Sequence, residues 1–296
     1  MLNFALEKSV KLTMERTYKI RRFPTVGDMV VMLLLFFTVQ MLTGMVANLL
    51  GFVPPATSAI DAVDIETYMN EQEALGRYVA ISYPVSFLLS IGALWLYVRL
   101  RGGKRSIHIN HSASGFNPSV VLVGALWLFS AQIILEPLMS QLPQSEGGGF
   151  GRGFWACFTA IVSAAVLEEL LCRGLIFEVL HKRLGVKTSI LFSSLFFGLI
   201  HFDIATAIVA VVAGIIFGVL YVRTSSLYTT IIIHSINNTL AFAMICCGVG
   251  DMSLYDIIGG GVAYWIVYGV ATAIFLACSI EAYIKVFRRK KPKINS

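Results

Sequence analysis

Three short stretches carry the residues whose types and spacing could do chemistry. The first places two carboxylates and a guanidinium, Glu168, Glu169 and Arg173, inside an otherwise apolar run. Two later apolar segments each carry a histidine, His201 and His234. A charge near the centre of a lipid bilayer costs from about 3 kcal/mol upward, so ionisable residues in such a setting indicate a functional site.

The spacing within these stretches predicts which side chains share a helix face. Glu169 and Arg173 lie four residues apart, so they can form an ion pair that offsets part of their burial cost. Glu168 is rotated by about 100° from its neighbour and can point into a cavity. His234 and Asn238 are also four residues apart and would present a ring nitrogen and an amide to one point.

Depth in the membrane predicts that these groups can meet. Phe197 precedes His201 by four residues and is expected to pack on the same helix face. At about 1.5 Å per helical residue, Glu168, His201, His234 and Asn238 fall in one layer between the bilayer centre and its cytoplasmic side. We therefore expect one polar centre built from three helices.

The chemistry that suits these groups is hydrolysis of a peptide bond by water. A glutamate in a pocket of low dielectric constant can act as a general base, and a histidine can pass a proton to the leaving amine. A second histidine and an asparagine can donate hydrogen bonds to an oxyanion. A glutamate and two histidines can also bind zinc, although the sequence contains neither an HExxH zinc motif nor a GxSxG serine motif. We expect no metal, with zinc as the alternative.

Composition predicts an integral membrane protein. Hydrophobic residues make up 57% of the chain and charged residues 14%, against about 25% charged residues in soluble domains. The apolar stretches are long and continuous, which favours an all-α polytopic bundle over a β-barrel. Eight transmembrane helices are expected at 29–50, 78–98, 118–138, 154–180, 188–202, 204–222, 227–247 and 259–286.

The distribution of lysine and arginine predicts the orientation and the domain limits. Every second connection is basic, which places both termini in the cytoplasm. The expected location is a bacterial plasma membrane. Residues 1–28 would form a cytoplasmic tail or interfacial helix, 29–286 one transmembrane domain, and 287–296 a basic tail. The net charge of +6 comes from these membrane flanks, so nucleic acid is not an expected partner. The expected partners are a peptide or protein substrate and the lipid bilayer.

The three stretches together resemble the CPBP family of CAAX prenyl endopeptidases and bacteriocin-processing proteins, also called the Abi family. The resemblance covers about residues 154–247. The motifs that carry it are Glu168-Glu169-x-x-x-Arg173, Phe197-x-x-x-His201 and His234-x-x-x-Asn238.

The resemblance implies a glutamate-dependent intramembrane endopeptidase and a role for each motif residue. Glu168 would activate the water with His201, while His234 and Asn238 would stabilise the oxyanion. The acidic–basic pair of the first motif would shape the site. If zinc is bound, its ligands would be Glu168, His201 and His234.

Other interpretations remain open at this stage. Intramembrane Glu, Arg and His also build proton-coupled transporters, although no inverted repeat is visible. A non-catalytic membrane protein that binds peptides and confers immunity would need the same cavity. For an enzyme, we expect peptide processing rather than trimming of prenylated CAAX tails. Several further residues are expected to have no catalytic role. Three histidines are expected at the surface, namely His108, His111 and His181, and Asn237 is expected to help hydrate the site. Gly214 and Gly218 form a GxxxG pair that permits close helix approach, and the five cysteines are expected to pack as small apolar residues.

Overall fold

The computed structural model describes residues 23–58, 62–102, 116–142, 149–250 and 252–287. The rest of the chain lies outside the described residues. This includes most of the expected N-terminal tail, the connection with His108 and His111, and residues 288–296 of the basic tail. All regular structure in the described ranges is helical, and no strand occurs there.

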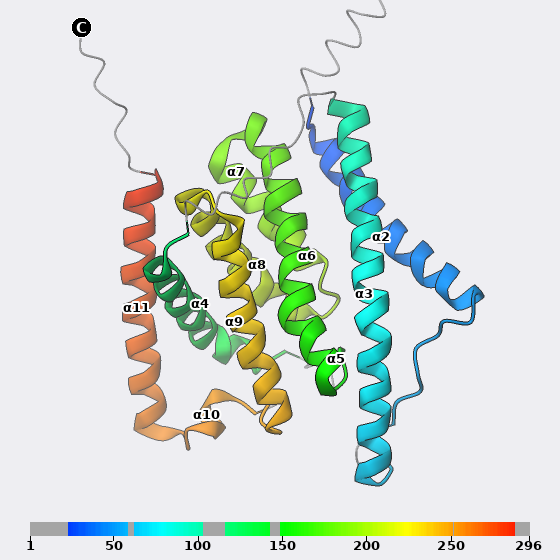
Figure 1. Cartoon of the computed structure of the whole chain (residues 1–296). Coiled ribbons are helices and arrows are strands. Elements are labelled where there is room, and N and C mark those ends of the chain that lie inside the picture. Colours follow the sequence, from blue (N-terminus) through cyan, green and yellow to red (C-terminus); the bar gives the residue numbers. More distant parts are fainter. Residues whose placement is uncertain (1–22, 59–61, 103–115, 143–148, 251, 288–296) are drawn as a thin grey trace, which may run out of the picture.

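Six of the helices among the described residues are long and apolar enough to cross a membrane. The all-α polytopic fold predicted from composition is therefore confirmed (Figure 1). The six helices are α2 (Val26–Leu49), α3 (Ile65–Gly102), α4 (Pro118–Met139), α8 (Ile204–Thr224), α9 (Leu227–Cys246) and α11 (Gly261–Phe287). A short helix, α10 (Leu254–Ile257), precedes the last one.

The expected fourth and fifth spans form one long helical run with a sharp bend. Within this run the structure contains two π-helical stretches, η2 and η3, and Gly185 breaks the helix with φ of 77° and ψ of 172°. A residue with a side chain would be strained at that positive φ, so glycine suits the bend. The segments of the run are α5 (Gly153–Phe158), η2 (Thr159–Ala164), α6 (Ala165–Glu169), η3 (Leu170–Phe177) and α7 (Glu178–Leu199).

Two predicted helix boundaries were wrong. The second span was expected to begin at residue 78, but α3 begins at Ile65 and takes in part of the acidic connection. The fifth span was expected to reach residue 202, but α7 ends at Leu199 and His201 lies in the turn before α8. Asp203 caps α8 by accepting a 2.7 Å hydrogen bond from the backbone N–H of Thr206, which holds the pKa of this carboxyl below its usual value.

Basic residues of the described helices gather at one end of the bundle. Figure 1 shows that α2 begins, and α3, α8 and α11 end, on the same side of the molecule. Arg99, Arg101, Arg223 and Lys285 lie in the last turns of three of these helices. This arrangement agrees with helices that alternate in direction across the membrane. The assignment of the basic end to the cytoplasm stays a prediction.

The GxxxG pair of α8 packs closely on α7. A Cβ atom added at Gly214 would lie 2.9 Å from the Cα of Ser194, and one at Gly218 would lie 3.1 Å from a side-chain carbon of Ile190. Small residues allow two helix backbones to approach in this way. This contact fixes α7 against α8 at the level where the polar centre is built.

Replacing Gly214 with alanine should destabilise the bundle. The new methyl group would contact the Ser194 backbone, which cannot rotate away, so we expect the free energy of unfolding to fall by about 1–3 kcal/mol. Unfolding of the purified protein in detergent would measure this change.

The matched control is Gly269→Ala in α11, where a Cβ would meet no atom within 4 Å. In both variants alanine favours the helix over glycine by about 1 kcal/mol, so this contribution is the same in the two proteins. Equal stability of the two variants would contradict the close contact between α7 and α8.

Candidate active site

A buried ion pair lies at the centre of the bundle. The Arg173 Nη1 lies 2.6 Å from Glu169 Oε1, and both side chains are fully buried, at 0% exposure. The Arg173 Nη2 donates a 2.8 Å hydrogen bond to the backbone carbonyl of Gly214 on α8. The ion pair expected from the four-residue spacing is therefore present, and it also joins η3 to α8.

Two phenylalanine rings enclose the arginine. The guanidinium carbon of Arg173 lies 4.9 Å from the ring centre of Phe197 on α7 and 5.2 Å from that of Phe217 on α8. A cation over an aromatic face is attracted to the ring, more strongly where water is absent. The position of Phe197 in the second motif is thus explained by contact with the arginine of the first.

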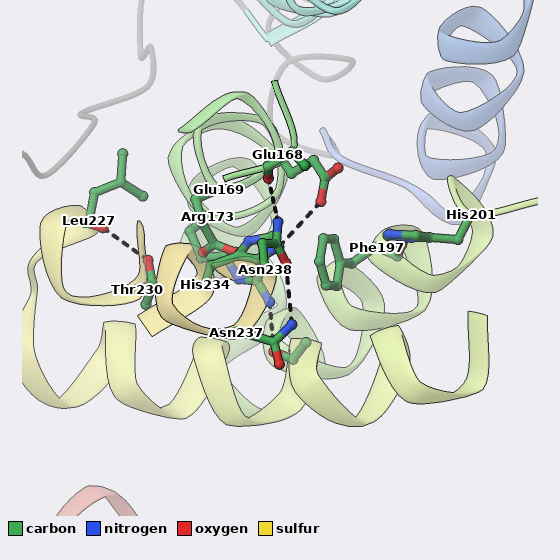
Figure 2. A network of polar contacts seen from close by, with 12 residues as sticks. Glu168, Glu169, Arg173, Phe197, His201, Leu227, Thr230, His234, Asn237 and Asn238 are labelled. Atoms are coloured by element: carbon green, nitrogen blue, oxygen red, sulfur yellow. Dashed lines mark hydrogen bonds and ion pairs between the residues drawn. The ribbon is translucent and has the colours of Figure 1, made fainter. Parts of the chain in front are cut away.

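His234 of α9 lies between the two glutamates. Its Nδ1 is 3.3 Å from Glu169 Oε1, and its Nε2 is 3.7 Å from Glu168 Oε2. The imidazole stacks on Phe217 with ring centres 5.2 Å apart and meets the edge of Phe197 at 5.6 Å. Figure 2 shows these groups converging. The rings hold the imidazole so that both of its nitrogens face a carboxylate.

Asn238 is held by a chain of amide groups. It donates a 2.8 Å hydrogen bond from Nδ2 to the carbonyl of Ala160 and accepts one of 3.2 Å from Asn237. Gln132 of α4 in turn donates to Asn237 at 2.6 Å. Asn237 is therefore a bridge between Gln132 and Asn238, and its expected help in hydrating the site stays a prediction.

Among the motif residues, His201 contacts Phe197 and lies apart from the glutamates and His234. Its Nδ1 is 2.8 Å from the carbonyl oxygen of Phe197, and its ring meets the Phe197 ring at 5.1 Å. Figure 2 shows the Phe197 ring between the two histidines. No hydrogen bond or ion pair of the described residues joins His201 to Glu168 or His234. The expected contact with Phe197 is present, whereas a direct contact with Glu168 is not.

Two π-helical stretches flank the paired glutamates. Ala160, whose carbonyl accepts from Asn238, lies in η2, and Arg173 lies in η3. Such stretches are rare in proteins and are frequent at functional sites. Each one here contributes a group to the polar centre, although residue types alone did not predict either stretch.

Glu168 has a partner that lies outside the three motifs. The hydroxyl of Tyr83, in α3, donates a 2.5 Å hydrogen bond to Glu168 Oε1. Sequence reasoning missed Tyr83 and Gln132, because both lie in apolar helices far from the motifs in the chain. A tyrosine within a membrane span was the available signal, but 11 tyrosines occur in the sequence.

Comparison with known proteins adds to this geometry. Residues 150–240 match the family model described as Type II CAAX prenyl endopeptidase Rce1-like. The resemblance to the CPBP family is confirmed over this segment. All three motifs fall within it, whereas Tyr83 and Gln132 do not.

A curated relative supports the same family. A Bacillus subtilis (strain 168) protein named "Putative membrane peptidase YdiL" is 32% identical over 79 residues. The match covers 27% of this chain and 32% of that protein, so the chain aligns with about a third of the relative's length. No solved structure matches the chain at a significant level.

The expected zinc ligands do not converge as the structure places them. Glu168 and His234 are neighbours, but His201 lies beyond the Phe197 ring. Within the described ranges, no group of three or more His, Cys, Asp or Glu side chains could hold a metal ion. We assign no ligand set, and the dependence on metal stays a prediction.

Removing Arg173 should strongly destabilise the protein. Arg173→Ala would leave Glu169 buried without its partner, so we expect a loss of about 3–5 kcal/mol in the free energy of unfolding. Arg173→Lys should not restore it, because one ammonium cannot reach both Glu169 and the Gly214 carbonyl with the geometry of the guanidinium. Thermal unfolding in detergent would measure both variants.

The chain offers a matched control in Arg77→Ala. Arg77 also pairs with a glutamate four residues earlier, Glu73, at 2.6 Å, but its side chain is 63% exposed. Exposed pairs of this kind contribute little. An Arg173→Ala variant as stable as the Arg77→Ala variant would refute the importance of the buried pair.

Proposed function

We propose that this chain is an intramembrane endopeptidase that hydrolyses a peptide bond with a water activated by Glu168. The observation that carries the proposal is the buried pair of Glu168 and His234, with Nε2 3.7 Å from Oε2. The family match over residues 150–240 supports the reaction class, and the relative's name supports a peptidase. The glutamate mechanism rests on the chemistry of the residues.

In the proposed reaction, Glu168 is the general base. Its Oε2 takes a proton from water, and the oxygen of that water forms a bond to the carbonyl carbon of the substrate. The C–N bond then breaks, and the proton passes from Glu168 to the leaving nitrogen. His234 faces Glu168 Oε2, so it would also face the oxygen that develops negative charge.

The other motif residues keep the roles implied by the resemblance. The side chain of Asn238 is held at both ends. Its Oδ1 accepts a hydrogen bond from Asn237, and its Nδ2 donates one to the backbone carbonyl of Ala160. We keep His201 among the proposed catalytic residues because of its place in the second motif. No contact with Glu168 supports this role in the described residues. Catalytic contacts in substrate-free proteins are often long and tighten when substrate binds.

The proposed substrate is a peptide or a membrane-anchored protein segment. The expectation from the sequence, processing of peptides such as leader or pheromone precursors, remains the proposal for its biological role. The description of the matched family model names a CAAX prenyl endopeptidase. A panel that contains prenylated CAAX peptides and unprenylated peptides therefore distinguishes the two substrate classes. A prenylated CAAX peptide as the best substrate would overturn the preference for unprenylated peptides.

Glu168→Gln should abolish peptide cleavage. The amide cannot take a proton from water, so kcat should fall by about 10²- to 10⁴-fold. His234→Ala should show a loss of the same order. Cleavage would be followed by mass spectrometry, using purified protein in proteoliposomes and a panel of prenylated and unprenylated peptides.

Glu178→Gln is the matched control. Glu178 also accepts a hydrogen bond from a tyrosine, Tyr221 at 2.7 Å, but it lies outside the polar centre. Cleavage by this variant together with loss in Glu168→Gln would support the proposal. Peptide binding without cleavage by the wild type would instead favour a non-catalytic binding protein, and coupled proton and solute movement would favour a transporter.

Metal removal provides a separate test. If Glu168 acts as a base and not as a ligand, the purified protein should contain no stoichiometric zinc, and chelators should leave kcat unchanged. Elemental analysis of the active protein before and after chelation would measure this. One tightly bound zinc per chain, lost together with activity, would establish the zinc-dependent alternative.

A further inference from the structure

We infer that Tyr83 is a positioning residue of this site, which holds Glu168 so that only one carboxylate oxygen faces the water. This inference rests on the proposed function and extends it to α3. Tyr83 lies outside the three motifs and outside the matched residues 150–240. The geometry of the Glu168 carboxylate carries the argument.

The two oxygens of Glu168 have different partners. Oε1 accepts the hydroxyl hydrogen bond of Tyr83 at 2.5 Å. Oε2 has His234 Nε2 at 3.7 Å, beyond hydrogen-bond distance. The Tyr83 hydrogen bond stabilises negative charge on Oε1, so Oε2 is the more basic oxygen and would take a proton from a water that also faces His234.

Aromatic contacts fix the position of the Tyr83 ring. It stacks on Phe87 with ring centres 4.5 Å apart and meets the edge of Phe150 at 5.5 Å. Phe87 in turn contacts Phe36 of α2 at 5.5 Å. The hydroxyl is therefore aimed by packing within α3 and across to α2, and α3 supplies a part of the site that the motifs lack.

The hydrogen bond also limits how Glu168 can move. A glutamate side chain has three rotatable bonds, and His234 alone touches only one of its oxygens. With Tyr83 on Oε1 and His234 beside Oε2, the plane of the carboxylate is set from two helices, α3 and α9. Misplacing a catalytic group by about 1 Å can cost about 10²-fold in rate, so this constraint would act on kcat.

The test is Tyr83→Phe, which removes the hydroxyl and keeps the ring contacts. We expect kcat to fall by about 10- to 100-fold, with KM within about two-fold, because the positioning role acts on Glu168 and not on substrate binding. The matched control is Tyr97→Phe on the same helix, whose hydroxyl donates at 2.7 Å to the carboxylate of Asp28, away from the site. Tyr97→Phe should leave kcat unchanged at a similar melting temperature.

A second background separates positioning from stability. In a Glu168→Asp variant the shorter carboxylate would lose the Tyr83 hydroxyl, so Tyr83→Phe should cause little further loss of kcat there. An unchanged kcat in Tyr83→Phe, or the same proportional loss in the wild type and Glu168→Asp backgrounds, would overturn the inference. If Tyr83→Phe and Tyr97→Phe lowered kcat equally, a general effect on stability would replace it.

The experiment also separates this inference from the proposed function. Loss of cleavage in Glu168→Gln with full kcat in Tyr83→Phe would overturn the positioning role alone. Absence of cleavage by the wild type, or full cleavage by Glu168→Gln, would overturn the proposed function and the role of Tyr83 with it.

Discussion

The burial of Arg173 is the constraint on which the rest of the structure depends. A guanidinium inside a membrane bundle requires a counter-ion and acceptors for its other hydrogen atoms. Glu169 supplies the charge, the Gly214 carbonyl supplies a second acceptor, and two phenylalanine rings cover the faces of the group. These contacts bring η3, α7 and α8 together at one level, and the neighbouring Glu168 is placed there as a consequence.

The same polar centre then organises α9 and α3. His234 reaches the centre because its ring packs against the two phenylalanines that enclose Arg173. Tyr83 of α3 reaches it and donates a hydrogen bond to Glu168. A single chain of contacts therefore runs from Arg173 through Glu169, His234 and Glu168 to Tyr83. Each member is held by a neighbour of different type, so the geometry of the Glu168 carboxylate depends on residues from several helices.

Much of this arrangement could be predicted from the sequence, because local rules govern it. The helical class follows from long apolar runs, and the Glu169–Arg173 pair follows from a spacing of four residues on one helix. His201 was expected within the fifth helix, but α7 ends at Leu199, two residues before it. Beyond a helix end, the helical rise and rotation per residue no longer give the depth and direction of a side chain. Tyr83 and Gln132 could not be predicted, since their contacts depend on how distant helices tilt and rotate against one another. The π-helical stretches also lack a signature in residue type.

The order in which the ionic contacts can form has a consequence for biogenesis. Glu169 and Arg173 are four residues apart on one helical segment, so their charges can neutralise each other as soon as that segment has folded, before α8 and α9 have been synthesised. The nascent segment then enters the bilayer with part of the cost of burying its two charges already offset. Its other partners, the Gly214 carbonyl and the aromatic rings, arrive later from downstream in translation. A chain with the arginine and glutamate on different helices would instead have to insert each charge alone.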